Sequence, residues 1–299
     1  MIKKIAKRML WNGITLWIIV SLSYLIIKLA PGNPYDKERA LSEEALKALK
    51  EKFDFSYWEY LGGILQGNFR HSYLYQDKKV IDLVLEALPV SLELGFWSIL
   101  LATIIGLLLG GVSAMLRKSP WDPILMLIAL VGIAVPNFVL GPLLQLFLGI
   151  ELNLFSVAGW FHWGDRVLPV FTLAAMYIAY IARIARTSMA DTFQQDFIAM
   201  AEAKGLSPWQ ILTKHVLRNS LIPVLHFLAP ATAAILTGTM VIEKIFYIPG
   251  LGRHFVNSAL HRDYPVALAV IILYSTLLLL LNFLADLIST WIDPRIDLE

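Results

Sequence analysis

Few titratable side chains lie within the long apolar runs of this sequence, so those few are the first candidates for chemistry. Asn282 and Asp286 are one helical turn apart in the last run, and Arg183 and Arg186 end an earlier one. An acid in apolar surroundings either relays protons or pairs with a cation. We expect Asp286 to pair with one of the two arginines and hold helices together, and a proton relay is the alternative.

Two further titratable groups lie at the ends of apolar runs. Glu93 directly precedes the run 94–116, and His226 lies a few residues into the run 219–242. From these positions both side chains can reach a polar surface. We therefore expect interfacial groups here, not a reactive centre.

Motifs that assemble reactive groups are absent from the sequence. It has no G-x-x-x-x-G-K-[ST] phosphate loop, no H-E-x-x-H metal pair and no G-x-S-x-G nucleophile elbow. It has no cysteine, which excludes disulfides and thiolate metal sites, and its net charge of +2 is too small to suggest nucleic acid. We expect no enzyme activity, no bound cofactor and no metal, so energy must come from a partner or an ion gradient.

The composition predicts a membrane protein. Hydrophobic residues make up 58% of the 299 residues and charged residues 16%, whereas soluble domains average about 45–50% and about 25%. A helix needs about 20 mostly apolar residues to cross a bilayer, and six runs approach or exceed this length. They are Met9–Leu29, Leu94–Leu116, Pro123–Ile150, Val167–Ala182, Asn219–Ile242 and Tyr264–Ala285. We therefore expect an all-α integral membrane protein with six transmembrane helices.

Lys and Arg in the short loops predict the orientation. With the N-terminus in the cytoplasm, twelve of them fall on the inner side and four on the outer side, as the positive-inside rule favours. Both termini are then cytoplasmic, residues 1–30 form the first span, and residues 31–87 form a periplasmic segment. Lys3 and Lys4 precede the first run as in a signal peptide, but the run exceeds the usual length of about 7–15 residues. We expect a retained anchor.

The predicted periplasmic segment has helix signals of its own. Ser42 is a candidate N-cap for a helix over Leu41–Lys52. The rings of Tyr57, Trp58 and Tyr60 favour the headgroup level of a membrane. We expect a small subdomain on the membrane surface, and a docking surface for a soluble partner is the alternative.

The longest loop on the predicted inner side, residues 183–218, carries signals for two helix ends. Gly205 suits the left-handed residue that closes a helix. Ser207 can cap a second helix that has Pro208 in its first position and Gln210 three residues on, which is a capping box. The sequence therefore predicts helix, sharp turn, helix.

We call the segment Ala201–Pro208 the elbow and expect it to be exposed. One interpretation is an ordinary turn that reconnects two membrane helices. The other is a surface presented to a partner. A turn that only reconnects spans could be much shorter, which favours the second interpretation.

Three prolines lie inside predicted spans, Pro136 and Pro142 in the third and Pro230 in the fifth. Each removes a backbone hydrogen bond and kinks its helix, and freed carbonyls are tolerated only against protein or a wet cavity. We therefore expect these spans to form the wall of a pore. The candidate path residues are Pro136, Asn137, Gln145, Thr237, Thr239 and Met240.

The second predicted span contains a G-x-x-x-G pattern formed by Gly106 and Gly110. Small residues at this spacing let helix backbones approach closely. We expect packing within the chain, and contact with a second subunit is the alternative.

The loop resembles that of a known family. Ala201-Glu202-Ala203-Lys204-Gly205-Leu206, with His215–Pro223 after it, resembles the EAA loop of binding-protein-dependent ABC importer permeases of the dipeptide, oligopeptide and nickel group. Further similar stretches are Ala30–Pro34, Gly238–Glu243, Ile248–Gly252, Arg262–Pro265 and Ile292–Arg295. The resemblance covers nearly the whole chain and is closest to the first permease subunits of oligopeptide systems.

This resemblance implies a type I ABC importer permease fold, with the permease domain over 88–293, the EAA loop at about 190–220 and a cytoplasmic tail over 294–299. The ATPase-coupling residues that it implies are Ala201, Glu202, Ala203, Lys204, Gly205, Leu206, Ser207 and Pro208. It implies three kinds of protein partner besides the lipid bilayer and the cargo: a second homologous permease subunit, two cytoplasmic ABC ATPases that use ATP and Mg, and a periplasmic peptide-binding protein. Ala199 departs from the wider superfamily, which has a glutamate six residues before the loop glycine.

The function that follows is a pore-forming permease subunit of an inner-membrane ABC importer of oligopeptides in a bacterium. Import of dipeptides, nickel or glutathione by the same family stays open, because these systems share the permease pattern. A proton-coupled secondary transporter is the alternative from another class. Such transporters often show repeated halves and ionisable groups near the midplane, and the sequence has no clear repeat and no deep acidic chain.

Overall fold

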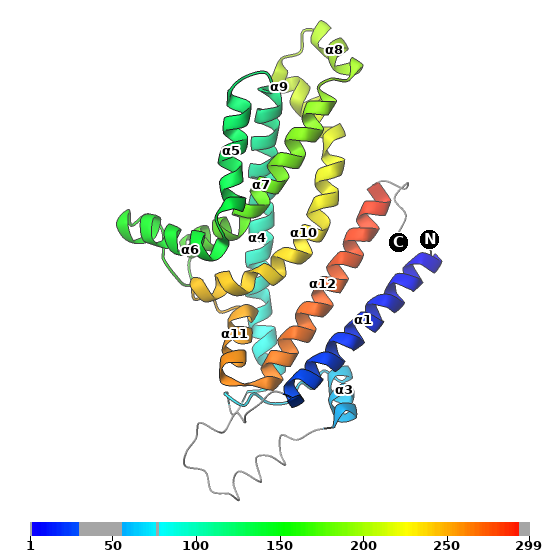
Figure 1. Cartoon of the computed structure of the whole chain (residues 1–299), viewed down its shortest axis with the longest axis vertical. Helices are drawn as coiled ribbons and strands as arrows, with labels where there is room; N and C mark the ends of the chain where they lie inside the picture. The colour runs from blue at the N-terminus through cyan, green and yellow to red at the C-terminus, as the bar shows by residue number, and fades with distance from the viewer. Residues whose placement is uncertain (1, 30–55, 76–77, 293–299) are drawn as a thin grey trace, which may run out of the picture. The chain divides into compact units, whose positions relative to one another are not determined.

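The computed structural model describes residues 2–29, 56–75 and 78–292, and these ranges are almost entirely helical (Figure 1). A single antiparallel bridge joins His71 and Lys79. The elements in chain order are α1 (Ile2–Leu29), α3 (Tyr57–Leu65), α4 (Val80–Met115), α5 (Trp121–Ala134), α6 (Asn137–Leu144), η1 (Gln145–Glu151), η2 (Trp163–Arg166), α7 (Val167–Thr192), α8 (Asp196–Ala203), α9 (Pro208–Ile211), η3 (Leu212–Val216), α10 (Leu217–Ile245), α11 (Leu251–His261) and α12 (Tyr264–Ile292).

Four helical stretches in the described ranges are long and apolar enough to cross a membrane: α1, α4, α7 with η2 before it, and α12. Two bent pairs meet the same test: α5 with α6 and η1, and Pro208–Ile235 with Thr239–Ile245, whose break falls inside α10. They bring the number to six when each pair counts as one span. The prediction of an all-α membrane protein is confirmed. The second span starts earlier than predicted, because α4 begins at Val80 and continues through Pro89.

The third predicted span is sharply bent and not merely tilted. Its two halves meet at 101°, and the break falls at Pro136, whose backbone is extended with ψ 140°. Pro136 has no N–H to donate, and it disfavours helical geometry at the residue before it. The predicted kink at this proline is confirmed, and Figure 1 shows α6 running away from the axis of α5.

The bend in the fifth span is not where we predicted it. The prediction placed a kink at Pro230, whereas the 51° bend lies between Ile235 and Thr239, about two turns later. Gly238 lies in this interval, and glycine adds backbone freedom that weakens a helix locally. The helix is assigned without interruption through Pro230.

Residues 1–91 and 249–277 form one compact unit. Its apolar core joins Val20 of α1, Tyr60 of α3, and Leu268 and Ile272 of α12, all of them buried. Burial of large side chains of this kind contributes roughly 1.5–3 kcal/mol each. Tyr60 is therefore a core residue, whereas Trp58 is 77% exposed, and the prediction that these rings lie at the headgroup level stays a prediction.

A buried carboxylate fixes a loop of the same unit. Asp263, which is 1% exposed, accepts hydrogen bonds from the Ser72 hydroxyl, from the Tyr73 N–H at 3.0 Å and from the Leu74 N–H at 3.2 Å. The loop before α4 is thereby attached to the residue before α12. Charge-assisted bonds of this kind are stronger than neutral ones, so Asp263 is a main support of the unit.

Residues 92–248 and 278–299 form the second unit, in which α7 is the central helix. Fifteen of its 26 residues are buried and six of these are alanine. A Cβ added to Gly106 would lie 2.7 Å from Ile181 Cβ, and one added to Gly110 would lie 2.6 Å from the Ala182 carbonyl oxygen. The prediction that these glycines pack within the chain is confirmed, since α4 lies directly on α7.

Some predicted features lie outside the described residues: the helix over Leu41–Lys52, the stretch Ala30–Pro34, most of Ile292–Arg295 and the tail 294–299. The predicted boundaries at residues 30 and 87 stay predictions. The sequence reasoning did not identify helix α3. Its signal is the capping box of Ser56 and Glu59, in which each residue bonds the other's backbone N–H.

Candidate functional site

The elbow closes helix α8 with a left-handed residue, as predicted. Gly205 has φ +79°. Its N–H donates to the Glu202 carbonyl at 2.9 Å, and the Leu206 N–H donates to the Ala201 carbonyl at 3.3 Å. This is the Schellman arrangement, which satisfies two carbonyls at a helix end. A Cβ on Gly205 would meet nothing within 4 Å, so glycine is required here for its backbone and not for space.

The second helix of the elbow also begins as predicted. The Gln210 N–H donates to Ser207 Oγ at 3.4 Å, and the Ser207 N–H donates to Gln210 Oε1 at 3.0 Å. Pro208 occupies the first turn, where its missing N–H costs nothing. The chain continues through α9 and the π-helical η3 into α10, so the elbow leads directly into the fifth span.

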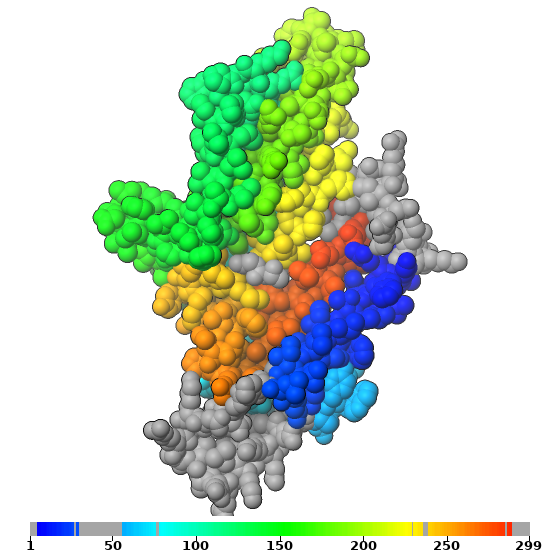
Figure 2. All heavy atoms as spheres, viewed as in Figure 1, coloured from blue at the N-terminus to red at the C-terminus, as the bar shows by residue number. Residues whose placement is uncertain are grey.

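The elbow lies at one end of the second unit, and Figure 2 shows the α8–α9 segment extending beyond α5 and α7. From Glu202 to Pro208 every residue except Leu206 is exposed. Two large apolar side chains beside it are exposed as well, Met200 at 63% and Trp209 at 53%. Apolar side chains gathered on a rigid projection are typical of a protein docking surface.

The base of the elbow is anchored to its own unit. Ile198 and Ile211 are almost fully buried. Arg117, in the turn between α4 and α5, donates to the Ala190 carbonyl at 2.8 Å and lies 5.9 Å over the ring of Phe193. A pocket of about 390 Å³ separates this turn from the elbow. The α4–α5 turn thus holds the end of α7 and the segment before α8, while the elbow itself is held by the helices that it joins.

Hydroxyl groups join α7 to α10 just behind the elbow. Ser188 Oγ donates to the Ser220 carbonyl at 3.2 Å, and Thr192 Oγ1 lies 2.8 Å from Ser220 Oγ. The Ser220 side chain is fully buried. The two helices that leave the elbow are therefore held together by specific bonds at their elbow ends.

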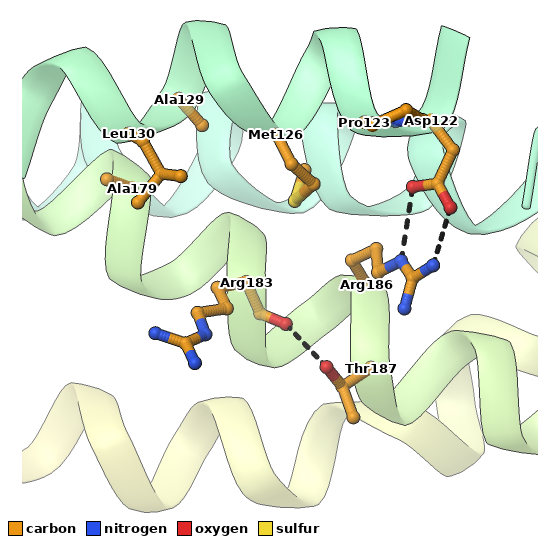
Figure 3. Close-up of a pocket in the computed structure, with 9 residues that line it drawn as sticks. All are labelled: Asp122, Pro123, Met126, Ala129, Leu130, Ala179, Arg183, Arg186 and Thr187. Carbon is orange, nitrogen blue, oxygen red and sulfur yellow. Dashed lines mark hydrogen bonds and ion pairs between the residues drawn. The ribbon is translucent and has the colours of Figure 1, made fainter. Parts of the chain in front are cut away.

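An ion pair joins α5 to α7 one helical turn further from the elbow (Figure 3). Arg186 donates to Asp122 from Nε at 3.1 Å and from NH2 at 2.5 Å, and Ser113 of α4 donates to the same carboxylate at 2.5 Å. The expected pair between Asp286 and Arg186 is wrong, because the two carboxylate oxygens at Arg186 belong to Asp122. The paired geometry identifies this contact as helix-joining, and the proton-relay alternative for Asp286 stays a prediction.

Sequence reasoning missed Asp122, although a signal was present. It lies between Trp121 and Pro123 at the start of the third apolar run, where an acid also interacts favourably with the helix N-terminus. Its partner is 64 residues away. Only the packing of α5 on α7 brings the two groups together.

Glu93 binds a cluster at the other end of α7. Arg166 Nε donates to Glu93 Oε1 at 2.8 Å, and Trp160 Nε1 donates to Glu93 Oε2 at 3.1 Å. The guanidinium carbon of Arg166 lies 4.8 Å from the ring centres of both Trp160 and Trp163. Glu93 is therefore a structural anchor for the segment before α7, and tryptophans at such a position are typical of a membrane interface.

One of the candidate path residues, Gln145, joins the third span to the fifth. Gln145 Nε2 donates to the carbonyls of Val157 at 2.6 Å and Ile245 at 3.3 Å, and a Cβ on Gly141 would lie 3.2 Å from the ring of Phe246. The far ends of the third and fifth spans therefore meet, as expected for two spans that share a wall.

The remaining candidates differ in exposure. Thr239 is fully buried, Pro136 is exposed, and Asn137 and Met240 are half-buried. The side chain of Thr237 lies outside the described residues. That these residues line a path stays a prediction. Within the described ranges no group of three His, Asp or Glu side chains could hold a metal ion.

Known proteins resemble this chain along its whole length. It is 40% identical over 305 residues to the oligopeptide transport system permease protein OppB of Haemophilus influenzae, with 99% of each chain covered. It is 37% identical over 304 residues to the dipeptide transport system permease protein DppB of Lactococcus lactis subsp. cremoris, with 100% of each chain covered.

A solved structure shares the fold. The inward-facing MetNI methionine ABC transporter aligns with a TM-score of 0.59 at 17% identity, and the alignment covers 70% of this chain and 96% of that one. The family described as binding-protein-dependent transport system inner membrane component matches residues 86–298. Taken with the full-length relatives, this match shows that the chain belongs to that family of transport permeases.

Proposed function

We propose that this chain is a pore-forming permease subunit of an ABC importer that moves oligopeptides from the periplasm into the cytoplasm. The observation that carries the proposal is the elbow: an exposed turn with a defined hydrogen-bonded geometry, which follows the membrane-spanning α7 by way of α8 and leads through α9 and η3 into α10. Relatives named as oligopeptide permease proteins, similar over their full length, support peptide as the cargo. A dipeptide is the second candidate, because relatives named for dipeptide transport are equally similar.

The energy comes from partners. The chain has no phosphate-binding loop, so two ABC ATPase subunits bind ATP and Mg and hydrolyse the nucleotide, while this chain binds neither. A second homologous permease subunit completes the pore, and a periplasmic peptide-binding protein delivers the cargo. The chain itself is a transport subunit and not an enzyme.

The elbow is the docking point for the ATPase. Its residues from Glu202 to Pro208 are the accessible part, and Met200 and Trp209 add apolar area on either side. Closure of the ATPase pair around ATP displaces the elbow. The hydroxyl bonds among Ser188, Thr192 and Ser220 then make α7 and α10 move together, and the movement opens the pore to the other side.

This mechanism requires the elbow, both termini and the turn before α5 to lie in the cytoplasm. The excess of Lys and Arg on that side supports the arrangement. The segment that contains Leu154, between η1 and η2, then faces the periplasm, and Glu93 with its tryptophans lies at the outer interface.

The test uses the absence of native cysteine, since one introduced cysteine becomes the only thiol of this chain. In the assembled complex, Lys204→Cys should form a crosslink with an ATPase subunit. Leu154→Cys, a control at an exposed position near the opposite end of α7, should form none and should react instead with an impermeant reagent added from outside. Labelling of Lys204→Cys from outside, or ATP hydrolysis that peptide and binding protein fail to stimulate, contradicts the proposal.

A further inference from the structure

A pocket of about 450 Å³ opens between α5 and α7, beside the Asp122–Arg186 ion pair (Figure 3). Its size is within the range of small-ligand sites, about 300–1,000 Å³. Apolar side chains form one wall and two arginines with a threonine form the other. The lining residues are Asp122, Pro123, Met126, Ala129, Leu130, Ala179, Arg183, Arg186 and Thr187.

The charges in this pocket do not balance. Asp122 is the only acid in the lining, and both of its oxygens are bound by Arg186. Arg183 is exposed, and its guanidinium makes no ion pair within the described part of the chain. Figure 3 shows its side chain directed away from the Asp122 pair. The pocket therefore carries one uncompensated positive charge.

The position of Arg183 gives this charge a meaning. It lies 16 residues after Val167 in α7, about 24 Å along the helix, one turn further from the elbow than the Asp122–Arg186 pair and near the inner end of the predicted span. A guanidinium there that lines a pocket, with no acid left to pair with it, is available to an anion. The planar guanidinium matches a carboxylate, because it can donate two parallel hydrogen bonds.

We propose that Arg183 binds the C-terminal carboxylate of a peptide on its way through the pore, with the peptide's last side chain against Met126, Ala129 and Leu130. The inference rests on the proposed function. A carboxylate is the one group that linear peptides of every sequence share. The apolar wall, with a flexible methionine, accepts side chains of different shape, so the site binds peptides independently of their sequence.

The experiment compares two peptides that differ only in a free or an amidated C-terminus. The complex is reconstituted in vesicles with saturating binding protein, whose affinity for each peptide is measured separately. We expect Arg183→Gln to slow uptake of the free acid about tenfold and uptake of the amide less than twofold. Arg183→Lys keeps the charge but cannot donate two parallel hydrogen bonds, so its rate of free-acid uptake should lie between those of the unaltered chain and Arg183→Gln. Lys7→Gln removes an exposed cation of α1 outside the pocket and should change neither rate.

The outcomes separate the inference from the proposed function. If the unaltered complex shows no peptide-stimulated uptake, the proposed function fails. If it transports but Arg183→Gln affects acid and amide equally, or neither, the carboxylate site is overturned. A defect that is equal for both peptides and appears only in vesicles with anionic lipid would assign Arg183 to a lipid phosphate instead, and would also overturn the inference.

Discussion

Substitution of Gly205 tests whether the shape of the elbow matters for transport. At φ +79° a residue with a Cβ costs about 1–2 kcal/mol, and a β-branched side chain is at the upper end of that range. A Cβ there would meet nothing within 4 Å, so no steric overlap with neighbouring residues adds to this cost. We therefore expect Gly205→Val to reduce the population of the native elbow by a factor of roughly 5–30.

The assay is ATP hydrolysis by the reconstituted complex, stimulated by peptide and binding protein. We expect stimulation to fall in the order Gly, Asn, Ala, Val, because asparagine tolerates the left-handed conformation better than other residues with a Cβ. The amount of complex in the membrane should be unchanged across the series. If peptide and binding protein stimulate ATP hydrolysis by the Gly205→Val complex as strongly as by the unaltered complex, the mechanical role of the elbow is refuted. An asparagine variant as poor as the valine variant would show that size, and not backbone conformation, is the requirement.

Four further predictions concern stability, measured as the melting temperature of the purified chain. Gly110→Ala should cost about 1–3 kcal/mol, because its Cβ would lie 2.6 Å from a backbone oxygen of α7. Gly13→Ala meets nothing within 4 Å and, inside helix α1, should stabilise the chain by up to about 1 kcal/mol. Asp263→Ala should cost more than Asp263→Asn, since it removes every acceptor from three donors. Asp122→Asn should cost about 1–3 kcal/mol, below the value for a fully buried pair because Arg186 is 34% exposed. Burial, with the nearby Arg253 charge, lowers the pKa of His254, so the imidazole binds a proton more readily in the unfolded chain than in the folded one. The free energy of unfolding should therefore fall as the pH drops through about 6.5. His254→Gln should flatten this pH dependence.

The sequence predicted features that depend on near neighbours. The apolar runs identified the six spans because crossing a bilayer requires length and composition, which are local properties. The elbow was predicted residue by residue, since Gly205, Ser207 and Gln210 act through hydrogen bonds to residues only three positions away. The bend at Pro136 has a similar local cause.

Features that depend on packing were not predicted. The partner of Arg186 proved to be Asp122, which only the contact of α5 with α7 brings near. The beginning of α4 at Val80 was missed because Asp82, Glu86 and Pro89 interrupt the apolar pattern, although a helix that continues beyond the bilayer can carry them. The 101° angle between α5 and α6 follows from what α6 packs against, whereas a proline alone specifies only that a break occurs.

The way α7 is packed explains how a displacement at the elbow can reach the pocket at Arg183. Gly106 and Gly110 of α4 and Gly132 of α5 all bring backbone against α7, each with less than 3 Å for an added Cβ. Such contacts leave no room for α7 to slide past its neighbours, because any axial shift would bring larger side chains into the glycine positions. A force on the elbow is therefore more easily relieved by tilting α4, α5, α7 and α10 together than by moving one helix alone. Arg183 and Arg186 lie on the helix that such a tilt would carry, so their charged groups would move with it, and the Asp122–Arg186 pair would stay intact because α5 tilts together with α7.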